Sequence, residues 1–216
     1  MPDKGPGLGP VPGEVAAIVL AAGASRRFGS DKLLHPLTLR GVTLPLAAHS
    51  LRPWLETFGH VTVVVRPGSE TFCSAIETAL GAGKPGAIES GKIRWVECVD
   101  AAQGMAASLV CGVRANRDAA GWLIGLADMP AVPLTAITGV RNALSAGAVL
   151  AAPSCDCRRG HPVGFASHYC AELLALHGDT GARRLLERDI SKVVDIKIDD
   201  AGIFADIDIP GDLHTL

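Results

Sequence analysis

The stretch AAIVLAAGASRRFGSDK, residues 16–32, joins a short apolar run to a loop of small and charged residues. Residues 16–21 are almost continuously apolar, which is typical of a strand that is buried on both faces. Similar runs follow at residues 61–66, 93–98, 122–127 and 148–152, and helical patterns separate or follow them at about 45–57, 70–82, 104–116, 133–145 and 168–176. Strands that alternate with helices form βαβ units, so we expect an α/β fold of three layers, α/β/α, with a mostly parallel sheet.

The domain organisation is simple. Residues 1–14, MPDKGPGLGPVPGE, alternate Pro and Gly and can bury almost nothing, which predicts a flexible leader. No internal repeat or linker is visible after it, and a chain of 216 residues can bury a substantial core. We therefore expect residues 15–216 to form a single domain.

Composition excludes several classes of function. The formal net charge is −2, no run of Lys and Arg occurs and aromatic residues make up only 4%, so we expect no nucleic-acid partner. The apolar runs are too short to span a bilayer, and no leader of signal-peptide type is present, so we expect a cytoplasmic protein without a membrane partner. The six cysteines are scattered rather than spaced as a disulfide framework, which fits a reducing compartment.

The loop after the first strand has the composition of an anion-binding site. Small residues around Gly23 and Gly29 let backbone N–H groups point at a bound phosphate. Arg27 could grip phosphate oxygens through its planar fork, and Lys32 would add a compact charge. The segment matches neither the P-loop nor the dinucleotide pattern. An ordinary strand-to-helix turn with solvated Arg and Lys side chains is the alternative.

The full string L-A-A-G-x-S-x-R-F-G-x-x-K, which starts at Leu20, resembles the signature of nucleotidyltransferases with a glycosyltransferase-A-like fold. This resemblance implies a Rossmann-like fold of the nucleotide-diphospho-sugar transferase type. It also implies that Leu20, Ala21, Ala22 and Gly23 contact the nucleotide, and that Arg27 and Lys32 act in catalysis together with Asp128.

Three acidic residues are candidates for holding Mg²⁺, with Mn²⁺ as a possible substitute. Asp128 follows the apolar run 122–127, and Mg²⁺ prefers one or two carboxylates together with substrate phosphates. A helix N-cap is the alternative role for Asp128. Asp206 and Asp208 alternate with apolar residues, so in a strand both would face one side; a plain surface strand is the alternative. The resemblance implies that this late segment returns to the metal site, with Asp208 ahead of Asp206, whereas Asp212 looks like a helix N-terminal acid.

Three further segments resemble those of the molybdenum cofactor cytidylyltransferases. The first is QGMAASL at 103–109, whose counterpart in that family lies near the base, and it implies nucleotide contacts from Gln103, Gly104, Met105 and Ser108. The others are RRGHPV at 158–163 and GDTGAR at 178–183, which imply acceptor contacts from Arg159, Gly160, His161, Asp179 and Arg183. A plain helix start explains the first segment equally well, and a lone His such as His161 is commonly structural.

The resemblance implies transfer of CMP from CTP to the terminal phosphate of molybdopterin or the molybdenum cofactor, for a molybdenum hydroxylase that the protein would contact transiently. The pair Ala21-Ala22 before Gly23 resembles the sequence of the family members that use CTP, whereas those that use GTP typically have Gly at the position of Ala22. The methyl group of Ala22 would crowd a purine more than a pyrimidine. Three alternatives stay open: a guanylyltransferase of the same family, a cytidylyltransferase for a sugar or polyol phosphate, and a non-catalytic cofactor chaperone. Cys155 and Cys157 depart from the family pattern; together with His161 they could contact a metal, but a mobile loop with incidental cysteines is the simpler interpretation.

Overall fold

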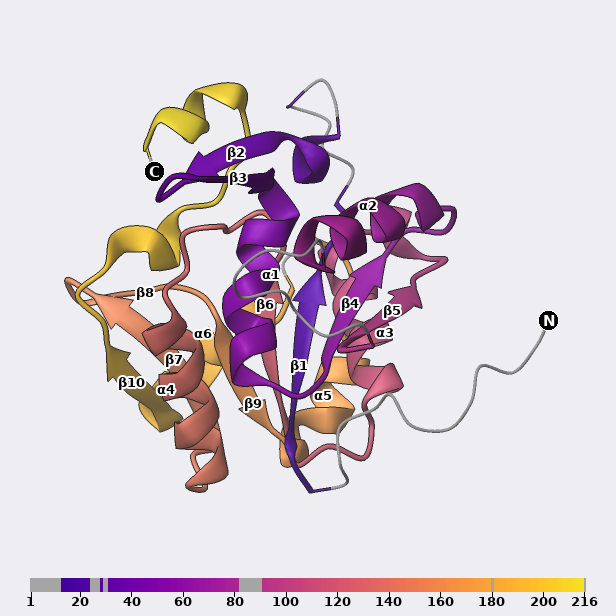
Figure 1. Ribbon diagram of the computed structural model, residues 1–216. Helices are drawn as coiled ribbons and strands as arrows, with labels where there is room; N and C mark the ends of the chain where they lie inside the picture. The colour runs from indigo at the N-terminus through magenta and orange to yellow at the C-terminus, as the bar shows by residue number, and fades with distance from the viewer. Residues whose placement is uncertain (1–12, 24–27, 29–30, 82–90, 180, 216) are drawn as a thin grey trace.

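A computed structural model of the protein describes residues 13–23, 28, 31–81, 91–179 and 181–215. Its centre is an eight-stranded sheet in the order β10-β7-β9-β6-β1-β4-β5, with β8 paired to β7 (Figure 1). The strands are β1 (Val15–Leu20), β4 (Val61–Val65), β5 (Ile93–Glu97), β6 (Gly121–Leu126), β7 (Leu150–Cys155), β8 (Arg158–Arg159), β9 (Val163–Ala166) and β10 (Val193–Lys197). A separate hairpin consists of β2 (Pro36–Leu39) and β3 (Val42–Pro45).

Helices cover both faces of this sheet, which confirms the predicted three-layer α/β/α architecture with a mostly parallel sheet (Figure 1). One face carries α1 (Leu46–Thr57), α2 (Glu70–Gly81) and α4 (Leu134–Ser145), and the other carries α3 (Met105–Ala115), α5 (Cys170–Leu174) and α6 (Arg183–Arg188). Strand β1 serves both layers, because Ala17 and Val19 join one apolar core and Ala16 and Ile18 the other. This double burial explains its continuous apolar sequence.

The five strands and five helices that the apolar patterns predicted all form within a few residues of their expected ends. The patterns missed the β2–β3 hairpin, α6, β10 and the antiparallel strand β9, which lies between β6 and β7. No described helix combines the length and the apolar character needed to cross a bilayer. The predicted leader lies outside the described residues except for positions 13 and 14.

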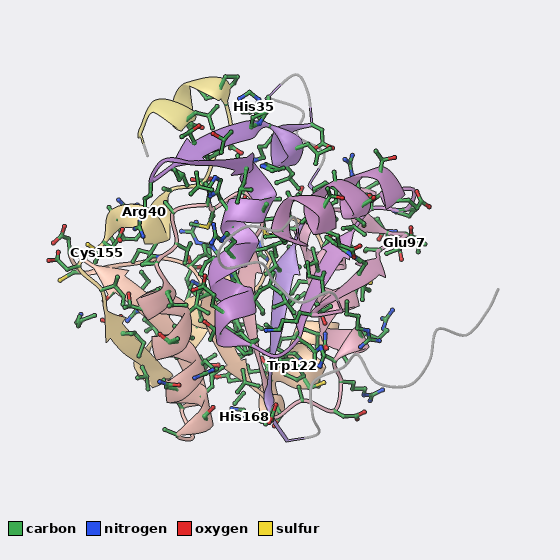
Figure 2. The ribbon with its side chains drawn as sticks, viewed as in Figure 1. His35, Arg40, Glu97, Trp122, Cys155 and His168 are labelled. Carbon is green, nitrogen blue, oxygen red and sulfur yellow. The ribbon has the colours of Figure 1, made fainter. Side chains whose placement is uncertain are left out.

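Two expectations about local structure were wrong. Residues 205–208 form no strand; the chain runs from the 3-10 helix η5 (Ala201–Phe204) to the 3-10 helix η6 (Pro210–Thr215) without pairing to the sheet. The cysteine-containing segment, which was expected to be a mobile loop, is a tight hairpin in which Asp156 and Cys157, with φ of 48° and 62°, turn the chain between β7 and β8. Cys155 therefore lies at the outer edge of the molecule, whereas Trp122 lies within it (Figure 2). All six cysteines are free thiols.

Candidate active site

The candidate site is a cleft of about 650 Å³ at the carboxyl ends of the central strands. Strand β1 pairs in parallel with both β4 and β6, with Leu20 opposite Val64 and Leu126, so the residues that follow these strands meet at one edge. The cleft is lined by Leu20, Ala21, Ala22, Gly23, Lys32, Leu33, Arg66, Ala101, Ala102, Gly104, Met105, Ser108, Leu126, Asp128, Asp179 and Asp208. It thus brings together the loop after β1, the start of α3 and two of the three predicted metal-binding acids.

Lys32 is held inward by the local structure of its segment. Asp31 caps a 3-10 helix, η1 (Lys32–Leu34), because its carboxylate accepts the backbone N–H of Leu33 at 3.2 Å. The Leu33 side chain is buried in the core next to it. As a result Lys32 is only 7% exposed, which is rare for a lysine unless its charge is compensated.

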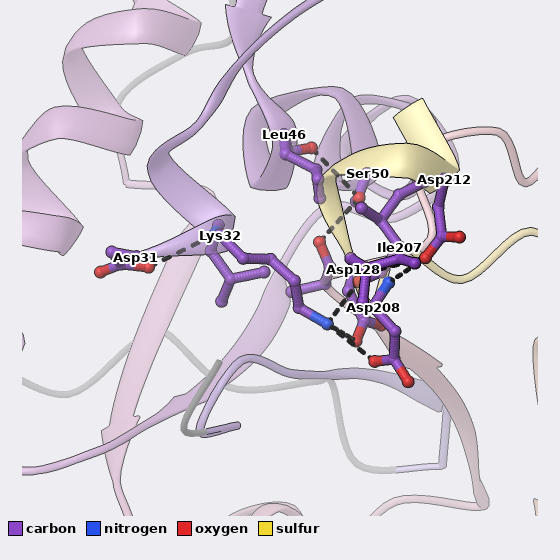
Figure 3. A network of polar contacts seen from close by, with 11 residues as sticks. Asp31, Lys32, Leu46, Ser50, Asp128, Ile207, Asp208 and Asp212 are labelled. Carbon is purple, nitrogen blue, oxygen red and sulfur yellow. Dashed lines mark hydrogen bonds and ion pairs between the residues drawn. The ribbon is translucent and has the colours of Figure 1, made fainter. Parts of the chain in front are cut away.

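That compensation comes from two separate parts of the chain (Figure 3). The Nζ of Lys32 donates to Oδ2 of Asp128 at 2.8 Å and to the carbonyl oxygen of Ile207 at 2.5 Å. It also lies 3.4 Å from Oδ1 of Asp208. One ammonium group therefore contacts two of the three carboxylates that the sequence predicted to bind a divalent cation.

Asp128 is placed by hydrogen bonds that fix the end of β6. The backbone N–H of Ala127 donates to the carbonyl of Leu20 at 3.0 Å, and the buried hydroxyl of Ser50 in α1 donates to the carbonyl of Ala127 at 2.8 Å. The second carboxylate oxygen of Asp128, Oδ1, is buried and has no hydrogen-bond partner among the described residues. A buried acceptor of this kind is costly unless a cation or water satisfies it, so the site fits a hard divalent ion.

The tail of the chain supplies Asp208 but not Asp206. Ile207 is fully buried, and its backbone N–H donates to the carbonyl of Asp128 at 3.0 Å. This anchor places the carboxylate of Asp208 toward Lys32, while Asp206 is exposed and is not among the residues that line the cleft. Asp206 lies instead near His161. Within the described part of the chain no group of three His, Cys, Asp or Glu side chains forms a metal site, so a divalent ion would need substrate oxygens to complete its coordination.

The start of α3 forms one wall of the cleft and packs against Gly178, Asp179 and Gly181. Gly104 has φ of 119°, and a Cβ there would lie 2.2 Å from Oδ1 of Asp179, so no other residue fits without a shift. The carbonyl of Gly178 accepts the N–H of Ala106 at 3.1 Å. Met105, Ser108 and Asp179 line the cleft, whereas the amide of Gln103 donates to Asp100 and is not part of the lining.

Four predicted acceptor-binding residues lie outside the cleft lining. Arg159 is 3.6 Å from Asp195 at the sheet edge, and Arg183 pairs with Glu187 in solvent at 2.7 Å. Gly160 packs against Ile203. The Nδ1 of His161 is buried and has no hydrogen-bond partner among the described residues. Burial lowers the pKa of His161, although the charges of Asp128 and Asp206 act in the opposite direction. The lowered pKa favours a neutral ring at neutral pH.

Arg66 is a residue of the cleft that the sequence analysis missed. It follows β4 directly, next to β1, and it forms no hydrogen bond or ion pair with a described residue. Its charge at the end of the predicted apolar run 61–66 was the available signal. Arg27, the other expected cation, lies outside the described residues.

Comparison with known proteins agrees with this geometry. The purine catabolism protein PucB of Bacillus subtilis (strain 168) is 33% identical over 201 residues, which cover 89% of this chain and 91% of PucB. The structure of Rv0371c from Mycobacterium tuberculosis H37Rv aligns with a TM-score of 0.71 at 24% identity, over 94% of this chain and 97% of Rv0371c. A complex of Rv0371c with manganese gives 0.69 at 22% identity, over 95% and 98%.

These structural likenesses confirm the glycosyltransferase-A-like fold. The model of the MobA-like NTP transferase domain matches residues 17–193, which include the loop after β1, the start of α3 and Asp128. The chain therefore belongs to the family of MobA-like NTP transferase domains and is a nucleotidyltransferase.

Proposed function

We propose that the protein transfers CMP from CTP to the terminal phosphate of molybdopterin or the molybdenum cofactor and releases pyrophosphate. The observation that carries the proposal is the cleft itself, where Lys32 lies 2.8 Å from Asp128 beside the small-residue loop after β1. Such a site combines donors for phosphate oxygens with acids for a metal, which is what phosphoryl-type transfer requires.

The reaction needs no general base from the protein. An oxygen of the acceptor phosphate, already anionic at neutral pH, bonds to the α-phosphorus of CTP, while the bond from that phosphorus to the bridging oxygen breaks and pyrophosphate leaves with the electron pair. Backbone N–H groups near Gly23 and the ammonium of Lys32 would hold the phosphates. Arg27 is proposed to hold the departing β- and γ-phosphates. Asp128 and Asp208 would hold a Mg²⁺ ion, which neutralises charge on the triphosphate. The manganese bound in the Rv0371c complex supports a divalent ion in this fold.

Lys32 has to change partners for this chemistry. In the structure its ammonium is bound to Asp128, Asp208 and the Ile207 carbonyl. When the carboxylates hold a divalent ion, the ammonium is repelled from them, and a triphosphate offers new acceptors within the same cleft. We therefore expect nucleotide and metal to bind together, each helping the other to displace Lys32 from the acids.

Two features support the choice of CTP and of the recipient. Ala22 lines the cleft next to Gly23, and its methyl group would crowd a purine more than a pyrimidine. PucB is named for purine catabolism, and xanthine is a purine, which agrees with a xanthine-dehydrogenase-like molybdenum hydroxylase as the recipient of the product. We further propose transient contact with that enzyme and a cytoplasmic location, where free thiols such as the exposed Cys157 persist.

The test is an assay with purified protein, Mg²⁺, each of the four nucleoside triphosphates and molybdopterin, followed by chromatography of the products and measurement of pyrophosphate. The proposal predicts a cytosine dinucleotide and pyrophosphate with CTP. A product with GTP only would make the protein a guanylyltransferase, and a product with methylerythritol phosphate or a sugar phosphate would change the acceptor. Tight binding of molybdopterin without consumption of any nucleotide would favour the chaperone.

Gly23→Ala should separate folding from nucleotide binding. A Cβ at Gly23 meets no atom of the described residues within 4 Å, so the free energy of unfolding should change by less than about 1 kcal/mol. The added methyl would nevertheless enter the cleft where the phosphates are expected, so the affinity for CTP should fall by about tenfold or more. Thermal unfolding and calorimetric titration measure the two quantities.

Gly59→Ala is the control, because a Cβ at Gly59 also meets no atom of the described residues within 4 Å and Gly59 does not line the cleft. This variant should bind CTP like the wild type. Unchanged affinity in Gly23→Ala would place the triphosphate elsewhere.

A further inference from the structure

The tail of the chain contributes to the cleft although it lies beyond the family match, which ends at residue 193. After β10 at the sheet edge the chain returns to the end of β6, where Ile207 is buried and bonded to Asp128. The tail then supplies two acceptors for Lys32: the Ile207 carbonyl and the Asp208 carboxylate. The position of this short segment therefore decides where Lys32 and a metal ion are bound.

Beyond Ile207 the segment has little apolar burial to hold it. Asp208 is half-buried and Ile209 is 47% exposed, and residues 205–208 form no strand. A short peptide without sheet pairing or a buried side chain has low local stability unless its backbone groups are bonded. Hydrogen bonds to the backbone of Asp208 therefore help to fix its orientation.

The carboxylate of Asp212 provides such a contact. One of its oxygens, Oδ2, accepts the backbone N–H of Asp208 at 2.7 Å and that of Ile209 at 2.9 Å (Figure 3). The N–H of Asp212 in turn donates to the carbonyl of Ile209 at 3.0 Å, so the turn into η6 is closed from both sides. These donors, first Ile209 and then Asp208, lower the pKa of Asp212, and the charge of Lys32 lowers it further.

We propose that Asp212 is a positioning residue that orients Asp208 and the Ile207 carbonyl toward the cation of the cleft. Asp212 does not line the cleft, and its carboxylate bonds the backbone N–H groups of Asp208 and Ile209. The inference rests on the proposed function for the presence of a cation in the cleft. The residues that it concerns, Ile207, Asp208 and Asp212, lie outside the family match at residues 17–193. Partners that orient metal-binding carboxylates commonly matter about 10- to 100-fold for metal affinity.

The test compares Asp212→Ala and Asp212→Asn by calorimetric titration of Mn²⁺ in the presence of a CTP analogue that cannot be cleaved. Asp212→Ala should weaken Mn²⁺ binding by about 10-fold or more. Asp212→Asn keeps an oxygen acceptor for the same N–H groups and should recover most of the affinity. In turnover assays Asp212→Ala should raise the Mg²⁺ concentration needed for half-maximal rate more than it lowers the rate at saturating Mg²⁺.

Asp200→Ala is the matched control. Asp200 caps η5 in the same tail, since its carboxylate accepts the N–H of Gly202 at 2.8 Å, but it is not part of the cleft lining. It should lower thermal stability by an amount similar to Asp212→Ala and leave Mn²⁺ affinity unchanged. If both variants weaken Mn²⁺ binding equally, or if Asp212→Ala binds Mn²⁺ like the wild type, Asp212 is only structural.

The same experiment keeps the inference apart from the proposed function. A wild type that releases no pyrophosphate with any acceptor, while Asp212→Ala still weakens Mn²⁺ binding, would refute the function and leave the role of Asp212 intact. Should Asp212→Ala fail to fold, Asp212→Asn and Asp212→Ser decide the matter, because both can accept a backbone hydrogen bond and should bind Mn²⁺ almost as tightly as the wild type. Loss of Mn²⁺ binding in the folded Asn and Ser variants would overturn the inference, as would a wild type that binds no Mn²⁺.

Discussion

Lys32→Met should lower turnover by about two to three orders of magnitude, which is the usual cost of removing a single donor that stabilises transferred charge. The same substitution should strengthen the binding of Mn²⁺ to the protein without nucleotide. These opposite effects follow if the ammonium group, which pairs with Asp128 and Asp208 in the structure, pairs with a phosphate of the bound nucleotide as proposed.

The size of the second effect can be bounded. Two unit charges about 4 Å apart interact by about 4 kcal/mol at an effective dielectric constant of about 20. A tenfold change in affinity corresponds to about 1.4 kcal/mol, so a gain of about tenfold remains even if solvent at the half-exposed Asp208 screens more than half of the interaction. Electron paramagnetic resonance of free Mn²⁺ measures this gain directly, and pyrophosphate release measures turnover.

The control for Lys32→Met is Lys197→Met. Lys197 also pairs with a carboxylate, Asp195 at 2.7 Å, but it is exposed at the sheet edge and away from the cleft. It should change neither turnover nor Mn²⁺ binding. If Lys32→Met binds Mn²⁺ no better than the wild type, the ammonium does not compete with the metal; if it retains full turnover, Lys32 has no role in the transfer.

Asp128→Asn should lower turnover by at least about two orders of magnitude, since a metal ion contributes several kcal/mol of charge stabilisation. In this variant, the nucleotide should no longer increase the affinity for Mn²⁺. Asparagine keeps the shape of the side chain, and Lys32 retains its bonds to Ile207 and Asp208. The protein should therefore stay folded, with a loss of stability of about 1–3 kcal/mol from the broken, partly buried pair. Circular dichroism melting and pyrophosphate release test the two statements.

Asp195→Asn provides the comparison for Asp128→Asn. It removes a carboxylate that pairs with Lys197 and lies near Arg159, outside the cleft. Turnover should stay at the wild-type level. Full activity of Asp128→Asn, or an equal loss in both variants, would remove Asp128 from the metal site.

The sequence predicted the central sheet and its helices because β1, β4 and β6 are buried on both faces and can only be apolar. It missed both hairpins for a local reason. Their turns use Arg40-Gly41 and Asp156-Cys157, all with positive φ, rather than the Asn-Gly or Asp-Gly pairs that indicate such turns. Strand β9 was missed because it has only four residues, and a pattern this short does not distinguish a strand from a loop.

The sequence could predict which residues meet around the cleft where a residue directly follows a strand, but not where the position of a residue depends on tertiary contacts. Asp128 and the residues at 20–23 line the cleft because parallel strands end at one edge. The alternation of Asp206 and Asp208 suggested a shared strand face, yet burial of Ile207 between them turns Asp208 toward Lys32 and leaves Asp206 exposed. No local pattern reveals that a tail 175 residues away in sequence supplies a carbonyl to Lys32.

A crystal structure of the protein with Mn²⁺ and a CTP analogue that cannot be cleaved would show which residues bind the metal and the triphosphate. We expect Mn²⁺ between the carboxylates of Asp128 and Asp208, the triphosphate along residues 20–23, and the Nζ of Lys32 on a phosphate oxygen instead of on Asp128. A triphosphate bound outside this cleft, or Lys32 still paired with Asp128 while Mn²⁺ and nucleotide are in place, would contradict this expectation.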